Sequence, residues 1–446
     1  MALRDLFVFA MVFGFLPQIF SKPHVGILLW SWLSYMNPHR ISWGLAMNFP
    51  FAQIVAISTM VGMLFSKESK RIPLTGLTVL WIIYIIWMCI TTIFAMFPDA
   101  AFELFIRTFK IQLVTFFTIM VMGSKKRLNM LVWVIVASLG YYGVKGGIFT
   151  LMTGGVYRVW GPPSSFIEDN NALALALTMV LPLMNYLRIS SQNRWVRWAL
   201  LISMLLTSVS VLGSQSRAAF ISILSVAMFL WLKSKNKVIT AATIILLIPA
   251  LFAFMPQAWH DRMASIYTTD EEGKFEGSAE SRIITWKTIL NLAKDRPILG
   301  VGFNPWSPLL YKLYSTDAPP GYSAAAHSIY LGPLAEHGWP GLGMFVTILF
   351  IAWRTGSRTI RQCRGHPDLE WLANLIKMVQ LGLIAYCTGG TFHNLAYFDL
   401  PWHLIAIMVL GRMVVEEHSK ATETVNNTKL YSWSGTLQDT KAVFGR

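Results

Sequence analysis

Three residues of this sequence carry side chains suited to transfer chemistry on a diphosphate. Arg217 lies in GSQSRAAF, Arg282 in ESRIITWK and His327 in AAAHSIYLGPL. A guanidinium binds phosphate oxygens through two parallel hydrogen bonds and does not lose its charge. A neutral imidazole can accept a proton from a hydroxyl group, which is the task of a general base. Brought together, the three residues could hold a diphosphate and activate a hydroxyl for attack.

Each of these residues also has a purely structural explanation. Arg217 lies at the junction of two apolar segments, where an arginine can anchor the chain at a membrane interface. Arg282 lies in a long polar loop, where most arginines are simply solvated, and a lone histidine is usually a hydrogen-bonded packing residue. Convergence of the three at one face is what would favour the chemical interpretation.

Other cations lie within apolar segments, where a charge is costly and usually faces a cavity or a partner. Glu103, Arg107 and Lys110 are spaced i, i+4 and i+7 on one helical face. An internal Glu103–Arg107 ion pair would explain two of them without any ligand. Lys145, in GVKGG, lies deeper in its segment. We take Arg107, Lys110 and Lys145 as candidate substrate-binding residues.

The sequence predicts no metal site and no cofactor. His337, in LAEHGWPGL, follows His327 by ten residues, and a continuous helix would turn the two about 80° apart, given ~100° per residue. No HExxH and no DxD motif occurs. An acidic turn at residues 270–272 could hold a cation, but such turns are usually only solvated. We assign His337 a supporting role in substrate binding.

The elements around these side chains are membrane-spanning helices. The chain has 446 residues, of which 54% are hydrophobic and only 13% charged. Its apolar residues form blocks long enough to cross a hydrocarbon core roughly 30 Å thick. This excludes a soluble globular domain, a disordered chain and a coiled coil. The blocks are 5–20, 46–65, 74–98, 103–122, 127–153, 171–188, 195–213, 217–233, 237–255, 339–356, 371–393 and 400–415.

The charged residues predict which loops face the cytoplasm. The net charge of +15 comes mostly from short loops, so topology explains it better than nucleic-acid binding. Sixteen cations lie in five alternate loops, and the other short connections are nearly free of them. With a short re-entrant or interfacial segment near 25–36, we expect twelve spans and both termini in the cytoplasm. The cations are Lys67, Lys70, Arg71, Lys125, Lys126, Arg127, Arg188, Arg194, Arg197, Lys233, Lys235, Lys237, Arg354, Arg358, Arg361 and Arg364.

The predicted organisation is an all-α polytopic membrane protein with one large periplasmic loop. Residues 1–255 form nine transmembrane helices, residues 256–338 the loop, and residues 339–418 the last helices. Within the loop, apolar residues at helical spacing predict a helix over 280–294, ended by Asp295, Arg296 and Pro297. Residues 419–446 are polar and without periodicity, and are expected to form a disordered cytoplasmic tail.

The sequence resembles the bacterial O-antigen ligases. His327-Ser328, nine residues and then Gly338-Trp339-Pro340-Gly341 fit their pattern H-[NSQ]-x9-G-x2-[GTY]. The segments around Arg217 and Arg282 are similar to the two arginine segments of the O-antigen ligase and polymerase superfamily. NPHRISWG, FPFAQIVA and GPPSSFIEDNNALALAL also resemble the O-glycosylation ligases associated with exosortase systems. The likeness extends from about residue 34 to 345.

The resemblance implies a GT-C-like glycosyltransferase in the bacterial inner membrane. It would take a glycan from undecaprenyl diphosphate and join it to a lipid A–core sugar hydroxyl on the periplasmic face, in lipopolysaccharide biosynthesis. Arg217 and Arg282 would hold the diphosphate in place of a metal ion, and His327 would be the base of an inverting displacement. The same motifs fit an O-antigen polymerase or a protein O-oligosaccharyltransferase.

The main alternative outside the enzymes is a transporter of the lipid-linked glycan. A transporter would also need intramembrane cations, but many transporters show paired repeats, and none is visible here. An intramembrane protease fits less well, because GSQSRAAF lacks the glycine of GxSxG. We expect the donor lipid, the acceptor and membrane lipids as partners, and no nucleic acid.

Overall fold

The computed structural model describes residues 3–42, 44–67, 70–234 and 277–443, with scattered residues between 236 and 260. The acidic turn at 270–272 and most of the predicted span 237–255 lie outside this part of the chain. All regular structure that it contains is helical, as the sequence predicts.

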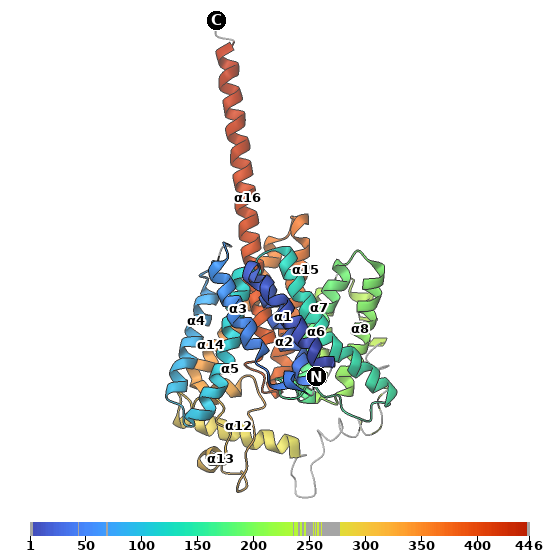
Figure 1. Ribbon diagram of the computed structural model, residues 1–446, viewed down its shortest axis with the longest axis vertical. Coiled ribbons are helices and arrows are strands. Elements are labelled where there is room, and N and C mark those ends of the chain that lie inside the picture. Colours follow the sequence, from blue (N-terminus) through green and yellow to red (C-terminus); the bar gives the residue numbers. More distant parts are fainter. Residues whose placement is uncertain are drawn as a thin grey trace.

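The α-helices form an up-and-down bundle with short 3-10 turns in the connections (Figure 1). The α-helices are α1 Leu3–Ser21, α2 Pro23–Met36, α3 Phe51–Phe65, α4 Gly76–Ile93, α5 Pro98–Val121, α6 Lys125–Met152, α7 Asn170–Ser190, α8 Arg194–Gly213, α9 Arg217–Lys233, α12 Gly277–Asp295, α13 Pro308–Tyr314, α14 Leu331–Gln362, α15 Glu370–Gly389 and α16 Asp399–Val443. The 3-10 turns are η1 Pro38–Ile41, η2 Leu45–Asn48, η3 Pro367–Leu369 and η4 Gly390–Phe392.

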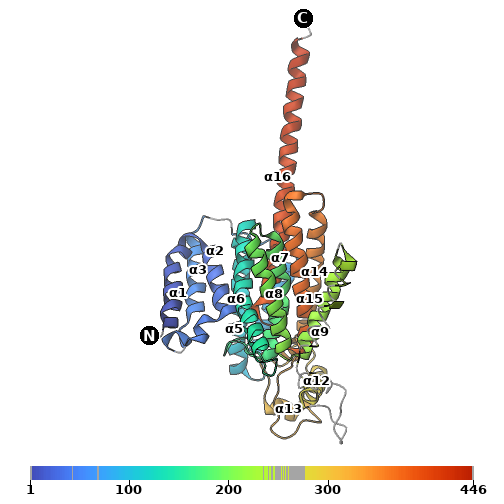
Figure 2. The same cartoon turned by 90° about the vertical axis from the view of Figure 1, so that its right-hand side faces the viewer.

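The two ends of the bundle differ in character. One end carries α12, α13 and the connections around them, and we call it the loop end. Lys125 begins α6 at the opposite end, where α16 also leaves the bundle, and we call this the basic end (Figures 1 and 2). The α5–α6, α7–α8 and α14–α15 connections, which hold three of the cation-rich loops predicted from the sequence, lie at this end (Figures 1 and 2).

Eight helical segments of the described residues are long and apolar enough to cross a membrane. Two shorter apolar helices, α3 and Arg217–Leu232 within α9, run beside them. This supports the predicted polytopic helical membrane protein, while the predicted number of twelve spans is not established. The eight segments are Leu3–Ser21, Gly76–Ile93, Pro98–Val121, Lys125–Met152, Asn170–Ser190, Arg194–Gly213, Leu331–Gln362 and Pro367–Phe392.

The segment near 25–36 is not a surface element. It forms α2, which runs antiparallel to α1 and α3 inside the bundle (Figure 2). Tyr35 on α2 is fully buried, and its hydroxyl is hydrogen-bonded to His403 Nδ1 on α16 at 2.7 Å. At ~1.5 Å per residue, 14 residues extend only about 21 Å, so interior packing rather than length holds this helix in place.

The extra reversal at α2 changes the position of the N-terminus. The chain begins at the loop end and finishes at the basic end (Figure 1). Arg4 donates a hydrogen bond of 3.1 Å to the carbonyl of Ile41, which lies in the connection from α2 to α3. The expectation that both termini share one face is therefore wrong, because α2 is a helix of the bundle.

The C-terminal segment also differs from its prediction. Where the sequence suggests a disordered tail from 419, α16 continues without a break to Val443 and extends beyond the bundle (Figure 1). No proline follows Pro401 in this helix, so nothing in its sequence forces the helix to end where the apolar block stops.

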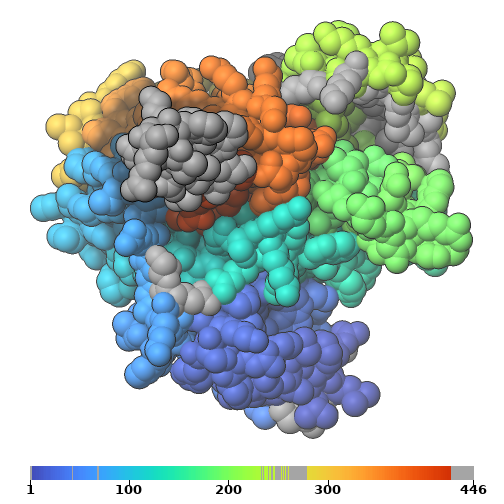
Figure 3. Space-filling view, turned by 90° about the horizontal axis from the view of Figure 1, so that it is seen from above, coloured from blue at the N-terminus to red at the C-terminus, as the bar shows by residue number. Residues whose placement is uncertain are grey.

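The centre of the bundle is α7, in which 83% of an 18-residue apolar stretch is buried within the molecule. It packs against α6, α8, α9 and α15. Seen from the basic end, the N-terminal helices form one edge of the molecule, in blue, and lie against α6 in teal (Figure 3). The loop end has a smaller core of its own, in which Ile289 and Leu292 of α12 pack with Leu310 of α13. The predicted helix over 280–294 is thus confirmed as α12.

Candidate functional site

His327 is held where three segments of the loop end meet. Trp286 on α12 donates a hydrogen bond of 2.9 Å from its indole nitrogen to the carbonyl of Ala326, directly before His327. The amide of Ile329, two residues later, donates to the carbonyl of Gly390 at 2.9 Å. The Trp286 ring also stacks on Phe392, with centroids 6.1 Å apart. These contacts fix the backbone on both sides of His327 and join α12 to η4.

His327 itself has a backbone conformation that few residues adopt. Its φ is +46°, in the left-handed region, where a residue other than glycine is uncommon and often marks a functional position. The conformation is maintained by the hydrogen bonds of Ala326 and Ile329 on either side. The ring is partly buried, so the side chain retains access to a substrate.

Arg217 is the first residue of α9, at the same end of the bundle. Ser216 caps this helix, because its hydroxyl accepts a hydrogen bond of 3.2 Å from the amide of Ala219. Further along α9, the Ser222 hydroxyl donates to the carbonyl of Ala385 on α15 at 2.8 Å. The helix therefore begins next to η4, with which it is in contact. A helix N-terminus carries partial positive charge, which adds to the guanidinium in favouring an anion.

The start of α7 is fixed to the turn that precedes Arg217. Asp169 caps α7 by accepting hydrogen bonds from the amides of Asn171 and Ala172. The side chain of Asn170, which is buried, donates to the carbonyl of Ser214 at 2.7 Å. The Asp169 carboxylate is thereby held beside the start of α9.

Two charged residues influence the imidazole of His327. Burial lowers the pKa of His327 below its usual 6.5, Arg282 lowers it further, and Asp169 partly offsets both effects. Arg282 and Asp169 therefore lie within electrostatic reach of the imidazole. A lowered pKa keeps the ring neutral near pH 7, which is the form that can accept a proton.

His393 is a member of this group that we did not single out from the sequence. It follows η4 and is only 4% exposed, and its Nε2 is buried with no hydrogen-bond partner among the residues that the structure describes. Burial lowers the pKa of His393 to about 3, with Asp169 raising it and Arg282 and His327 lowering it. His393 thus stays neutral near Asp169, Arg282 and His327. His393 is not part of any motif that we recognised in the sequence. Only its position near Asp169, Arg282 and His327 in the folded protein identifies it as a candidate site residue.

His337 belongs to a different environment. It is fully buried in α14, with Nδ1 2.7 Å from the Thr91 hydroxyl on α4 and its ring 4.5 Å from that of Phe303. Its carbonyl accepts a hydrogen bond of 2.9 Å from the Trp87 indole. Because α14 begins at Leu331, His327 and His337 do not share a helix, and the expected 80° relation does not apply. These contacts assign His337 a structural role.

The motif glycine Gly338 explains how α14 joins the loop. Its φ is +68°, and a Cβ there would lie 2.2 Å from the carbonyl oxygen of Ile298. The next residue, Trp339, donates its amide hydrogen to the carbonyl of Pro297 at 2.9 Å. Only glycine permits this close approach. It allows the segment that follows α12 to pack against α14 at Gly338, where the helix is kinked.

Arg107 and Lys110 line a separate cavity of about 780 Å³ between α3, α5 and the α2–α3 connection. We call this the basic cavity. The Arg107 guanidinium lies 3.7 Å from the centre of the Phe166 ring, and no Glu103–Arg107 ion pair is formed in the described part of the chain. Asp399 also lines the cavity and is buried. One of its carboxylate oxygens accepts a hydrogen bond from the Ser34 hydroxyl.

Lys145 lies in a third place. It lines an apolar groove of about 700 Å³ between α6 and α8, together with Trp133, Tyr141 and Met184. The structure therefore brings together Arg282 and His327, which were predicted from the sequence as site residues, near Arg217 at the start of α9. Asp169 and His393, which were not predicted, belong to the same group. The candidates Arg107, Lys110, Lys145 and His337 lie elsewhere.

Comparison with known families divides the chain into two parts. Residues 202–346 match the O-antigen ligase family, and residues 3–192 match a family of unknown function (DUF5935). The first range contains Arg217, Arg282, His327 and Gly338, whereas the second contains Asp169. His393 lies outside both ranges. No protein of curated function matches the sequence.

Proposed function

We propose that this protein is a membrane glycosyltransferase, because residues 202–346 match the O-antigen ligase family. It transfers O-antigen glycan from undecaprenyl diphosphate to a sugar hydroxyl of lipid A–core. The reaction takes place on the periplasmic face of the bacterial inner membrane, and the protein acts in lipopolysaccharide biosynthesis. The observation that carries the proposal is the grouping of Arg282, His327, His393 and Asp169 at the loop end.

The proposed reaction is a single displacement at the anomeric carbon of the donor sugar. His327 accepts the proton of the acceptor hydroxyl while that oxygen forms the new glycosidic bond. The bond from the anomeric carbon to the phosphate oxygen breaks, and its electron pair leaves with undecaprenyl diphosphate. Arg217 and Arg282 stabilise the charge that develops on the leaving group, so no metal ion is required. One displacement inverts the anomeric configuration.

Asp169 and His393 support this step near His327. Asp169 raises the pKa of His327, and its negative charge therefore stabilises the imidazolium that forms when the proton is taken. His393 stays neutral, and its buried Nε2 has no hydrogen-bond partner among the described residues; we assign it to a hydrogen bond with a substrate hydroxyl. In this proposal Asp169 is a positioning residue, whereas His393 contacts the substrate.

The other predicted binding residues are proposed to contact the lipid parts of the substrates. The basic cavity combines Arg40, Arg107 and Lys110 with apolar side chains of α3 and α5, which suits a phosphorylated lipid such as the acceptor. Phe166, in the same connection as Asp169, lines this cavity. Lys145 in its apolar groove would contact a lipid phosphate.

The proposed sidedness rests on the cations. Lys and Arg remain on the cytoplasmic side of membrane proteins, so the basic end is assigned to the cytoplasm. The loop end, with His327 and its neighbours, then faces the periplasm. Both glycan donor and lipid A–core would be accessible there.

An acceptor experiment separates the enzymes that share this donor chemistry. Purified protein and lipid-linked glycan are incubated in parallel with lipid A–core, free glycan and protein acceptors, with His327→Ala as the control. Transfer only to lipid A–core supports the ligase. Elongation of the free glycan would indicate a polymerase, and glycosylation of the protein acceptor would indicate an O-oligosaccharyltransferase. Movement of the lipid-linked glycan across vesicles without any product would indicate a transporter instead.

A further inference from the structure

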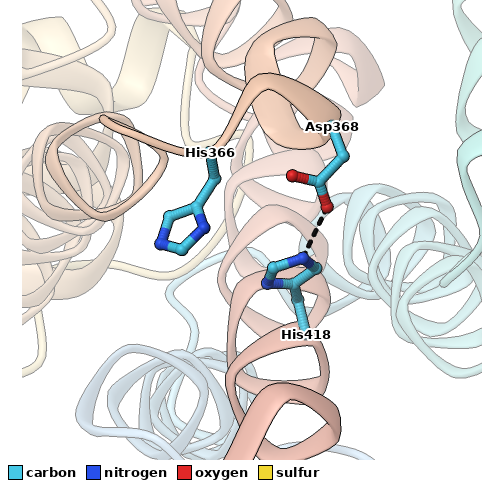
Figure 4. Close-up of side chains that lie close together, drawn as sticks. All are labelled: His366, Asp368 and His418. Carbon is cyan, nitrogen blue, oxygen red and sulfur yellow. Dashed lines mark ion pairs between the residues drawn. The ribbon is translucent and has the colours of Figure 1, made fainter.

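Three ligand-type side chains meet at the basic end, on the side opposite the proposed catalytic group. His366 and Asp368 lie in the connection between α14 and α15, and His418 lies on α16, fifty residues later (Figure 4). One ligand atom of each residue lies within 4.8 Å of the others. The rings of His366 and His418 are 5.3 Å apart, and His418 Nε2 is 2.5 Å from Asp368 Oδ2.

The backbone that carries two of these ligands is well fixed. The amide of His366 donates to the carbonyl of Cys363 at 3.3 Å, and the amide of Leu369 donates to the carbonyl of His366 at 3.0 Å. Pro367 between the ligands restricts the chain further, because its ring fixes φ. Adjustment on binding can therefore come from rotation of the side chains, since His366 and Asp368 are exposed.

The distances suit a transition metal ion after a small adjustment. Zinc binds histidine nitrogen at roughly 2.0–2.1 Å and carboxylate oxygen at about 2.0–2.2 Å, so ligand atoms of a tetrahedral site lie ~3.4 Å apart. His366 must move inward, and the hydrogen bond between His418 and Asp368 must lengthen as the metal replaces its proton. Two imidazoles and one carboxylate favour zinc, nickel or cobalt over magnesium or calcium, which prefer oxygen ligands only.

We propose that His366, Asp368 and His418 bind a divalent transition metal ion at the basic end. The ion links the α14–α15 connection to α16 at the place where α16 leaves the bundle (Figures 1 and 4). Arg361 and Arg364 lie near these ligands in sequence, but so do Glu370, Glu416 and Glu417, so charges of both signs lie around the site. Binding therefore depends mainly on coordination by the three ligands.

Direct metal binding tests the site. Tag-free protein in detergent is stripped with chelator and titrated with zinc chloride, and bound zinc and the unfolding temperature are measured. We expect one zinc per chain and a higher unfolding temperature, with no such effect of magnesium. His418→Ala and Asp368→Asn should each lose the stoichiometric zinc. Asp368→Asn preserves the size of the side chain, so its loss of zinc is independent of any effect of His418→Ala on folding. His327→Ala should bind zinc as the unmodified protein does.

Two results would overturn this proposal. One is a chelator-stripped protein that takes up no stoichiometric zinc, which would leave His418 and Asp368 as an ion pair only. The other is zinc uptake that is unchanged in both His418→Ala and Asp368→Asn. Glycan transfer is measured in the same samples, and stripping should leave it unchanged because the site lies at the other end of the bundle. The proposal on metal binding and the one on catalysis can therefore fail separately.

Discussion

The indole of Trp286 donates a hydrogen bond of 2.9 Å to the carbonyl of Ala326, the residue before His327. Trp286 lies one turn after Arg282 on α12, so a single helix both presents the arginine and fixes the histidine. The orientation of the proposed base relative to the proposed phosphate ligand therefore depends on this one contact and on the stacking of Trp286 against Phe392.

Trp286→Phe tests this coupling. Phenylalanine keeps an aromatic ring against Phe392 but cannot donate to Ala326, which removes a bond worth about 1 kcal/mol. We expect transfer to fall by roughly 10- to 100-fold, since small misplacement of a catalytic group is costly. Transfer rate and unfolding temperature are measured together. An unchanged rate would show that His327 is positioned without the indole.

His327→Ala should abolish most of the activity while the protein still folds and binds donor lipid. Loss of a general base typically costs on the order of 10²–10⁴ in rate. His337→Ala is the matched control, because this buried ring packs between α4 and α14 and its removal should lower stability more than rate per folded molecule. If His327→Ala instead lowers only stability, His327 is a packing residue.

The pH dependence of transfer should report the lowered pKa of His327. Protonation removes the lone pair that accepts the hydroxyl proton, so the rate should fall at acidic pH, with a midpoint below 6.5. Asp169 raises this pKa, so Asp169→Asn should move the acid limb to still lower pH. Rate profiles of both proteins are compared. A limb that does not move would show that Asp169 does not act on His327.

Arg217→Lys should be impaired although the charge is retained. An ammonium group cannot reproduce the two parallel hydrogen bonds of a guanidinium to phosphate oxygens. Arg282→Ala should likewise lose use of the donor, with a weaker affinity for undecaprenyl diphosphate. Lipid binding and transfer are measured for each variant. Normal turnover in both would reduce these arginines to interfacial anchors.

Cysteine labelling tests the path of the N-terminal helices. In a background without Cys89, Cys363 and Cys387, Ser21→Cys at the α1–α2 turn should react only with reagents that enter the cytoplasm. Ser323→Cys at the loop end should react from outside. Both side chains are exposed. Labelling of both positions from outside would restore the arrangement in which 25–36 does not cross the bundle.

The class of fold and part of the candidate site are determined by local sequence. Apolar blocks and loop cations predict a helical membrane protein. Both signals are local, because the transfer of a segment into lipid depends on the residues of that segment and of the loops beside it. Helical spacing alone predicted α12, and a short motif identified His327 with Gly338. The fixed position of Gly338 has a local reason too, since its positive φ admits no other residue without strain.

Tertiary structure decided which of these residues act together. Asp169 and His393 are separated from His327 by 158 and 66 residues, and only the packing of α7, α9, α12 and η4 brings them near it. The same packing buries His337, separates Arg107 and Lys145 from the group, and brings His418 to His366. It also makes α2 a helix of the bundle despite its short length. Contacts of this kind depend on how helix faces fit one another, which hydropathy along the chain does not encode.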